Sequence, residues 1–130
     1  HSPARAITFA ILSLPSSLIS YKYPLMDAQD YMRIALAEAS KAAARGEVPI
    51  GAVLVDGRTG AIIAQDGNRT IERADPTAHA EILVIRAGCA TAGAQRIPDF
   101  DLYVTLEPCA MCAAAISFAR IRALYYGAAD

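Results

Sequence analysis

Two short motifs in the second half of the chain most constrain its fold. The first is His79-Ala80-Glu81, and the second is Pro108-Cys109-Ala110-Met111-Cys112. Each is predicted to lie at the start of a helix. Cys109 and Cys112 stand three positions apart within the first turn of their helix, so both sulfur atoms point the same way. If His79 joins these two sulfurs, the fold must bring the starts of two helices together.

These side chains form a donor set for a metal ion. One nitrogen and two sulfurs are soft enough ligands to favour Zn²⁺ over Mg²⁺ or Ca²⁺. The partial positive charge at a helix N-terminus favours the thiolate form that a metal requires. Three protein ligands leave the fourth tetrahedral position for water, which is typical of a catalytic rather than a structural zinc. We therefore predict a zinc site at His79, Cys109 and Cys112.

Glu81 stands two residues after His79, which is too near in sequence for a comfortable fourth ligand. Its carboxylate is instead predicted to face the water on the metal. There it can take a proton from that water and pass it to a ring nitrogen and then to a leaving amine. The chemistry indicated is hydrolytic release of ammonia from an amino-substituted aromatic ring, with Glu81 as the catalytic residue.

Each motif alone has a simpler interpretation. A lone histidine near an apolar helix is more often a packed core residue, and a C-x-x-C pair can be redox-active or half of a zinc finger. The chain has no second C-x-x-C to complete a finger, and a redox pair gives H-A-E no role. The joint pattern of H-x-E followed by P-C-x-x-C is far more specific. It matches an established signature of zinc-dependent nucleobase deaminases.

The rest of the sequence predicts an α/β fold. Apolar residues recur at helical spacing from Asp27 to Arg45, with Asp27 as N-cap and Gly46 as the stop. A β-hairpin is expected from the strands at 50–56 and 61–65. A helix follows at 78–87, capped by Thr77 and ended by Gly88, and the remaining elements are a strand at 101–107, a helix at 108–119 and a strand at 123–128. The last three make a βαβ unit with parallel strands, and the fold class is a three-layer α/β/α sandwich with a mixed central sheet.

The two ends of the chain do not fit this pattern. Residues 1–25 include the apolar stretch from Ile7 to Ile19, which is too short to span a bilayer and is interrupted by Pro15. Because Met26 reads like a natural start, we expect residues 1–25 to be a non-native extension, with an export signal as the weaker alternative. The single folded domain is expected at 26–130. The strand at 123–128 is expected to be an open sheet edge unless another chain covers it.

Composition adds few limits. The 130 residues contain 12 Lys plus Arg and 13 Asp plus Glu, and the resulting net charge of −1 gives no general reason to expect a polyanionic partner. Three cysteines, two of them in the C-x-x-C pair, argue against a disulfide framework and favour a reducing compartment, the cytoplasm. Cys89 is expected to be a small packed residue.

Beyond these motifs, the sequence resembles the cytidine/deoxycytidylate deaminase superfamily and, within it, the bacterial tRNA-specific adenosine deaminases. The matching segments are EVPIGAVLV (47–55), GNRT (67–70), DPTAHAEI (75–82), LYVTLEPCAMCAAAI (102–116) and RIRALYYGAAD (120–130). The resemblance implies a homodimer that converts the wobble adenosine of a tRNA anticodon to inosine, after the base has flipped out into the pocket. It also implies a further strand and a C-terminal helix, so the chain is expected to be truncated after Asp130.

The resemblance implies roles for residues around the metal site as well. Asn68 is expected to hydrogen-bond the target base, and Ala80 to contact the base through its backbone N–H. Asp130 is expected to lie beside the backbone and ribose of the substrate. A lining role in the base pocket is implied for three consecutive residues, Glu47, Val48 and Pro49.

Three functions fit these residues, and a fourth possibility is that the truncated chain folds and binds zinc but no longer turns over substrate. The expected one is deamination of tRNA adenosine. The alternative is deamination of a free base, nucleoside or nucleotide, such as cytosine, guanine or dCMP, which the near-neutral charge leaves open. The third is a non-catalytic, zinc-stabilised binding module. Glu81 argues against it, because a structural site has no use for a carboxylate at an open metal position.

Overall fold

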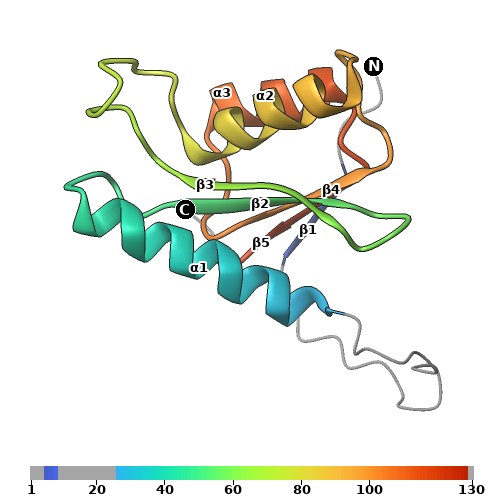
Figure 1. Cartoon of the computed structure of the whole chain (residues 1–130), viewed down its shortest axis with the longest axis horizontal. Coiled ribbons are helices and arrows are strands. Elements are labelled where there is room, and N and C mark those ends of the chain that lie inside the picture. The colour runs from blue at the N-terminus through green and yellow to red at the C-terminus, as the bar shows by residue number, and fades with distance from the viewer. Residues whose placement is uncertain (1–4, 9–25, 129–130) are drawn as a thin grey trace.

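The structure, a computed structural model, describes residues 5–8 and 26–128. Within these residues, three helices pack on a five-stranded sheet, with α2 and α3 on one face and α1 on the other (Figure 1). The helices are α1 (Ala28–Ala44), α2 (Ala80–Ala92) and α3 (Ala110–Ala119). The strands are β1 (Arg5–Thr8), β2 (Gly51–Asp56), β3 (Ile62–Gly67), β4 (Phe100–Val104) and β5 (Ala123–Tyr126).

The sheet is mixed, with strand order β1-β5-β4-β2-β3. β2 pairs antiparallel with both β3 and β4, whereas β4, β5 and β1 run parallel to one another. The predicted three-layer α/β/α sandwich, the β2–β3 hairpin and the parallel βαβ unit are therefore confirmed.

α1 begins and ends as the sequence predicts. The Asp27 carboxylate accepts a hydrogen bond from the backbone N–H of Asp30, and the Asp30 carboxylate accepts one from the N–H of Asp27. This reciprocal capping box satisfies backbone donors that would otherwise lack partners at the helix start. At the other end Gly46 has a φ of 84°, in the left-handed region that ends helices at glycine.

Side chains on alternate residues of β2 bury both faces of the sheet. Val53 and Val55 pack against α1, whereas Ala52 and Leu54 pack in the core beneath α2 and α3. A Cβ at Gly51 would overlap the backbone of α1, so this glycine permits the close approach of helix and strand. β2 is thus the buried centre of the fold.

The second predicted helix was wrong at both ends. The predicted cap Thr77 is not the N-cap of α2, which is His79. The predicted stop Gly88 lies inside α2, where a Cβ would overlap a leucine of β2, and the helix ends instead at Gly93, with a φ of 64°. A local pattern cannot distinguish a glycine that ends a helix from one that lets the helix approach a sheet.

The elements on either side of the cysteine pair are shorter than predicted. β4 ends at Val104 rather than at residue 107, and α3 begins at Ala110 with Cys109 as its N-cap, so Pro108 precedes the helix. β5 likewise ends at Tyr126. Residues 105–109, which were predicted to belong to the strand or the helix, form the loop that carries Cys109.

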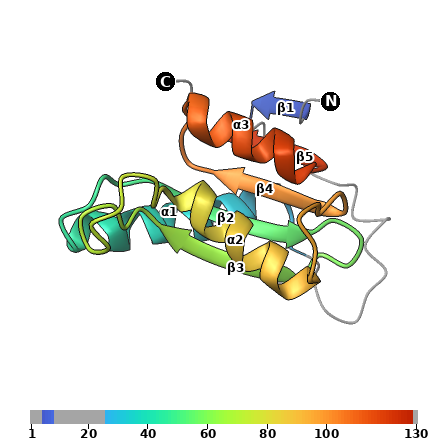
Figure 2. The same ribbon diagram turned by 90° about the horizontal axis from the view of Figure 1, so that it is seen from above.

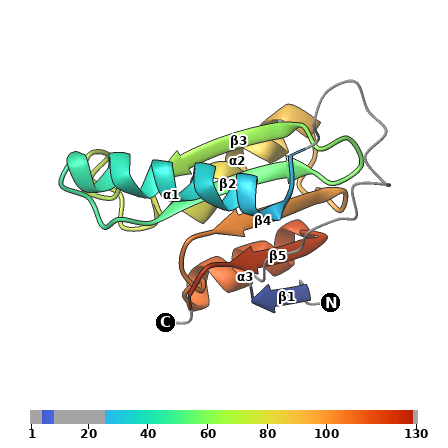
Figure 3. The ribbon, with the colours of Figure 1, turned by 90° about the horizontal axis from the view of Figure 1, so that it is seen from below.

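β1 is a strand that the sequence did not predict. It pairs in parallel with β5, with Arg5 opposite Ala123 and Thr8 opposite Tyr126, so the expectation that β5 is a sheet edge was wrong (Figure 3). Pairing between segments so far apart in the chain leaves no local sequence signal. Residues 9–25 lie outside the described part, and the non-native origin of residues 1–25 stays a prediction. No helix among the described residues is long and apolar enough to cross a membrane.

Candidate active site

The fold brings the two motifs to the same end of the sheet. Gly51, at the start of β2, lies opposite Gly67, at the end of β3, and Ala52 lies opposite Val104, at the end of β4. β3 leads through the connection 68–79 to α2, and β4 leads through a short loop to α3. The two helices consequently begin side by side above this end of the sheet (Figure 2).

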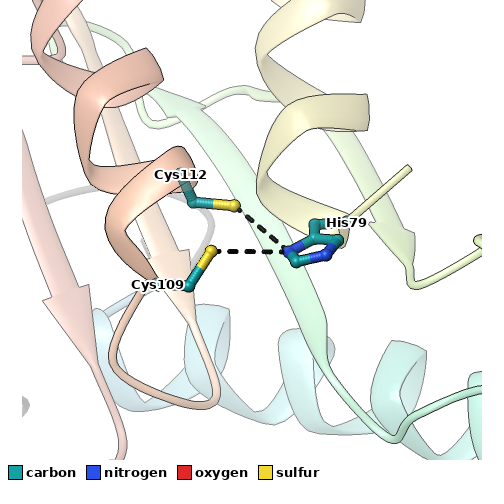
Figure 4. Close-up of side chains that lie close together, drawn as sticks. All are labelled: His79, Cys109 and Cys112. Carbon is teal, nitrogen blue, oxygen red and sulfur yellow. Dashed lines mark hydrogen bonds between the residues drawn. The ribbon is translucent and has the colours of Figure 1, made fainter. Parts of the chain in front are cut away.

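His79, Cys109 and Cys112 point toward one another (Figure 4). His79 Nδ1 lies 3.7 Å from Cys109 Sγ and 3.5 Å from Cys112 Sγ, and the three ligand atoms all lie within 4.8 Å of one another. A tetrahedral zinc ion, with bonds of about 2.3 Å to sulfur and about 2.0 Å to nitrogen, separates such atoms by about 3.5 Å. Both the chemistry of the donor set and its spacing therefore fit Zn²⁺.

Two of these residues occupy positions that usually cap a helix. His79 and Cys109 are the N-caps of α2 and α3, with extended backbones, and neither side chain makes a capping hydrogen bond. The residues preferred at N-caps are Ser, Thr, Asp and Asn, whose side chains accept from the first backbone N–H groups. Here the side chains of His79 and Cys109 turn toward each other instead. The two helix starts therefore lack the stabilisation that a capping side chain provides, and their N-cap residues are available as metal ligands.

The thiols differ in exposure: Cys112 is buried and Cys109 is exposed. Burial raises the pKa of the Cys112 thiol far above its usual value, and the neighbouring Glu81 and Cys109 add to the increase. The helix N-terminus was predicted to favour the thiolate, whereas the burial of Cys112 acts in the opposite direction. A cation bound among the ligands would supply the charge that stabilises this thiolate.

Glu81 lies in the first turn of α2 and is only 3% exposed. Burial raises the pKa of its carboxyl, although its hydrogen bond with Cys112 and the charge of His79 act in the opposite direction. Within the described residues, Glu81 Oε1 is buried without a hydrogen-bond partner. A buried carboxylate oxygen in that condition is unfavourable unless something bound beside it supplies the missing proton or donor.

Asn68 and Ala80, both expected to contact a base, are hydrogen-bonded to each other. Asn68 is buried, and its Oδ1 accepts the backbone N–H of Ala80 at 2.9 Å. The carbonyl oxygen of Asn68 accepts a hydrogen bond from Arg45 Nη2 at 2.9 Å. Sequence reasoning treated Arg45 only as a helix end, and no local signal marks its contact with a residue in another connection.

The other predicted substrate residues are arranged unevenly. Glu47 is buried, and its carboxylate accepts two backbone hydrogen bonds from the connection 68–79. Val48 and Pro49, next along the chain, are exposed. Asp130 lies outside the described residues. Cys89 is half-buried and packs against the core, as predicted.

Comparison with known proteins agrees with this site. Residues 25–128 match the model of the cytidine and deoxycytidylate deaminase zinc-binding region. With the His/Cys/Cys donor set, this match confirms the predicted Zn²⁺ cofactor.

Two curated relatives are described as tRNA-specific adenosine deaminases. That of Agrobacterium fabrum is 66% identical over 101 residues, which are 77% of this chain and 64% of the relative. That of Haemophilus influenzae is 52% identical over 99 residues, which are 76% of this chain and 57% of the relative. The chain thus spans less than two thirds of the length of either relative.

Two solved structures share the fold. One comes from studies of A-to-I editing by tRNA:A34 deaminases at the wobble position of transfer RNA. Its TM-score is 0.75 at 64% identity, over 78% of this chain and 77% of that one. The other is guanine deaminase from Bacillus subtilis, with a TM-score of 0.76 at 40% identity, over 80% of this chain and 66% of that one. Since proteins described with different purines share this fold, the fold alone does not select the base.

Proposed function

The chain belongs to the cytidine and deoxycytidylate deaminase family, and we propose that it is a zinc-dependent C–N hydrolase that converts adenosine to inosine at the wobble position of a tRNA anticodon. The observation that carries the chemistry is the convergence of one nitrogen and two sulfurs beside the buried carboxylate of Glu81. The choice of substrate rests on the similarity to tRNA-specific adenosine deaminases.

In this proposal His79, Cys109 and Cys112 would hold the zinc ion through one nitrogen and two sulfurs, a donor set also used by catalytic zinc sites. When bound, zinc lowers the pKa of a water molecule enough to make it a nucleophile near neutral pH. His79 offers Nδ1, which is the ring nitrogen that faces both sulfurs. Cys112 gives up its proton as the metal binds.

Glu81 holds and moves the proton. Its buried Oε1, without a partner among the described residues, suits a group that accepts a proton from the attacking water. Glu81 then delivers this proton to a ring nitrogen and assists departure of the amine. In net terms the bond from C6 of the base to its amino nitrogen breaks, a bond from C6 to oxygen forms, and ammonia leaves.

The base is held by residues around Asn68. The Oδ1 of Asn68 is occupied by Ala80, so the amide nitrogen of Asn68 is the donor offered to the base, and the Ala80 N–H orients that amide. Glu47, Val48 and Pro49 form one wall of the entrance, and Asp130 contributes beside the ribose and backbone. The roles of Asn68, Glu47, Val48, Pro49 and Asp130 follow from family resemblance, whereas the Ala80 N–H, which the resemblance assigned to the base, donates to Asn68.

We propose a homodimer as the functional state. The outer face of α3 carries no charged side chain and exposes Ala110, Ala113, Ala114 and Phe118, the last at 67%. Burying such a face against a second copy would remove it from water. Sedimentation at several concentrations tests this, since a protein that stays monomeric throughout contradicts it.

The deaminase domain is proposed to occupy residues 26–130, and the protein is proposed to work in the cytoplasm. The family match over 25–128 supports the first of these. A thiol-containing donor set that must stay reduced supports the second.

One experiment separates the substrate classes. The protein is incubated with an anticodon stem-loop that contains a wobble adenosine and, in parallel, with free adenosine, cytidine and guanine. Inosine that forms only in the RNA supports the proposal. Turnover of guanine alone would instead favour the second candidate, a free-base deaminase, for which the likeness to Bacillus subtilis guanine deaminase is the specific support.

A further inference from the structure

We propose that Glu47 is a positioning residue, whose carboxylate fixes the middle of the connection 68–79 and so holds the entrance of the active site in the shape that receives a flipped base and its RNA neighbours. This role rests on the proposed function, because it concerns the substrate of the same site.

The contacts of Glu47 are made with both carboxylate oxygens. Oε1 accepts the backbone N–H of Ile71 at 3.0 Å and lies 3.3 Å from the hydroxyl of Thr70, and Oε2 accepts the backbone N–H of Glu72 at 2.8 Å. Glu47 is 5% exposed. A buried carboxylate that receives two successive backbone donors makes a strong, directional link. It joins the α1–β2 connection to the β3–α2 connection.

The link is ionic at neutral pH. Burial alone would raise the pKa of Glu47, but the hydrogen bonds from Ile71, Glu72 and Thr70 and the positive charge of Arg45 keep it below its usual value overall. The carboxylate therefore stays charged and keeps both backbone donors occupied across the range in which a cytoplasmic enzyme works.

Both ends of the connection are tied independently of Glu47. Next to Asn68, the N–H of Arg69 donates to the carbonyl of Ala78 at 3.0 Å, just before His79. Asn68 itself accepts the N–H of Ala80. Because these bonds hold the segment around His79, loss of the Glu47 link should release the tip of the connection and leave the ligand group in place.

The tip carries the features that a substrate would meet. Ile71 is 72% exposed and Val48 is 55% exposed, and each lies within one residue of the Glu47 link. Unstacked bases of a single-stranded loop offer flat apolar faces that pack on such side chains. Fixing these two apolar groups before the RNA arrives lowers the entropy that binding must remove.

The test compares Glu47→Ala and Glu47→Gln with a matched control, Glu38→Ala. Glu38 is also a buried carboxylate, but it lies in α1 and bonds to Gln65 on the sheet edge, at 2.9 Å. The first readout is hydrogen exchange of the backbone amides of Ile71 and Glu72. It should accelerate at least about tenfold in Glu47→Ala and stay unchanged in the control. Zinc content should remain at about one ion per chain in all three variants.

The second readout is binding of the wobble-adenosine stem-loop, with Glu81→Ala present in every protein so that no turnover occurs. Glu47→Ala should weaken binding about tenfold. Glu47→Gln, which keeps one acceptor oxygen, should fall between Glu47→Ala and the reference protein, which carries Glu81→Ala alone. Glu38→Ala should bind as the reference does.

The outcomes are distinguishable. If the reference protein does not bind the stem-loop, the proposed function fails, and this role fails with it. If it binds but Glu47→Ala binds equally well, or Glu38→Ala weakens binding as much, the positioning role is overturned while the proposed function stands. Unchanged exchange at Ile71 and Glu72 in Glu47→Ala would overturn the link itself.

Discussion

Buried carboxylates at the two ends of the sheet differ in their hydrogen bonding. At the end with the ligand group, Glu81 Oε1 has no partner among the described residues, and α2 and α3 start without side-chain caps. At the opposite end, buried Asp101 accepts two hydrogen bonds from the guanidinium of Arg122, at 2.9 and 2.6 Å. At the first end an unsatisfied carboxylate oxygen lies where we propose chemistry, although Glu47 and Asn68 nearby are hydrogen-bonded; at the opposite end buried Asp101 is paired.

The opposite end also shows that a cavity does not by itself mark a functional site. A recess of about 640 Å³ lies there, lined in part by Tyr31, Asp101, Tyr103 and Arg122. Two of its polar groups have partners within the protein: Asp101 pairs with Arg122, and the Tyr31 hydroxyl donates to the carbonyl of Gly60 at 2.7 Å. Recognition of a ligand there would have to compete with these bonds, whereas Glu81 Oε1 at the other end has no partner among the described residues.

The largest contrast between the ends should come from removing a metal ligand. Cys112→Ala should lose the zinc ion, all ammonia release, and several kcal/mol of stability, about 2–5 kcal/mol, since both a buried side chain and the bound metal are lost. Metal analysis and thermal unfolding measure these effects. The control is Cys89→Ala, a half-buried free thiol away from the site, which should keep its zinc. Full zinc content in Cys112→Ala would contradict the assignment.

A smaller effect, on stability alone, is expected from breaking the paired end. Asp101→Ala leaves Arg122 without its partner, and because Arg122 is half-exposed and partly solvated the loss should be about 1–3 kcal/mol. Denaturant unfolding measures it, and zinc content should not change. If Asp101→Ala lost its zinc, the separation of the two ends into a chemical and a structural region would be wrong.

The smallest effect concerns pH. The backbone N–H of Arg58 lowers the pKa of Asp56, at the paired end; burial opposes this, and the Arg58 guanidinium adds to the lowering. A lowered folded-state pKa means that the stabilisation is complete above the usual aspartate pKa and is lost only as pH falls through the lowered value. Carboxyl NMR titration should therefore find Asp56 more ionised than a free aspartate at the same acidic pH.

Arg58→Ala refines this prediction. The variant keeps its backbone N–H, which is the main cause of the shift, so the Asp56 pKa should rise only part of the way toward its usual value. A pKa at or above the usual aspartate value in the wild-type protein would contradict the claim that hydrogen bonds from Arg58 stabilise the Asp56 carboxylate.

Sequence reasoning succeeded where the physical signal is local. The Asp27 N-cap and the Gly46 stop depend on residues within one helical turn, and both are present. Cys109 and Cys112 share a helix start, so their convergence follows from spacing alone. His79 was joined to them through a known signature, and the structure brings the three side chains together.

The features that sequence reasoning missed depend on pairs far apart in the chain. The bond from Arg45 to Asn68 and the link from Glu47 to Ile71 join different connections, and nothing in either segment alone marks its partner. The pairing of β1 with β5 is of the same kind. Gly88 was misassigned because the sheet against which it packs cannot be seen from its neighbours in sequence.

The most direct test of the central claim is to measure zinc content and ammonia release together in Glu81→Ala, with the wobble-adenosine stem-loop as substrate. We predict about one zinc ion per chain, as in the wild-type protein, with ammonia release reduced by at least about a thousandfold, because the proton carrier is lost while the ligands stay. Wild-type turnover in a variant that carries full zinc would contradict the proposal that the unsatisfied carboxylate beside the ligand group moves the proton.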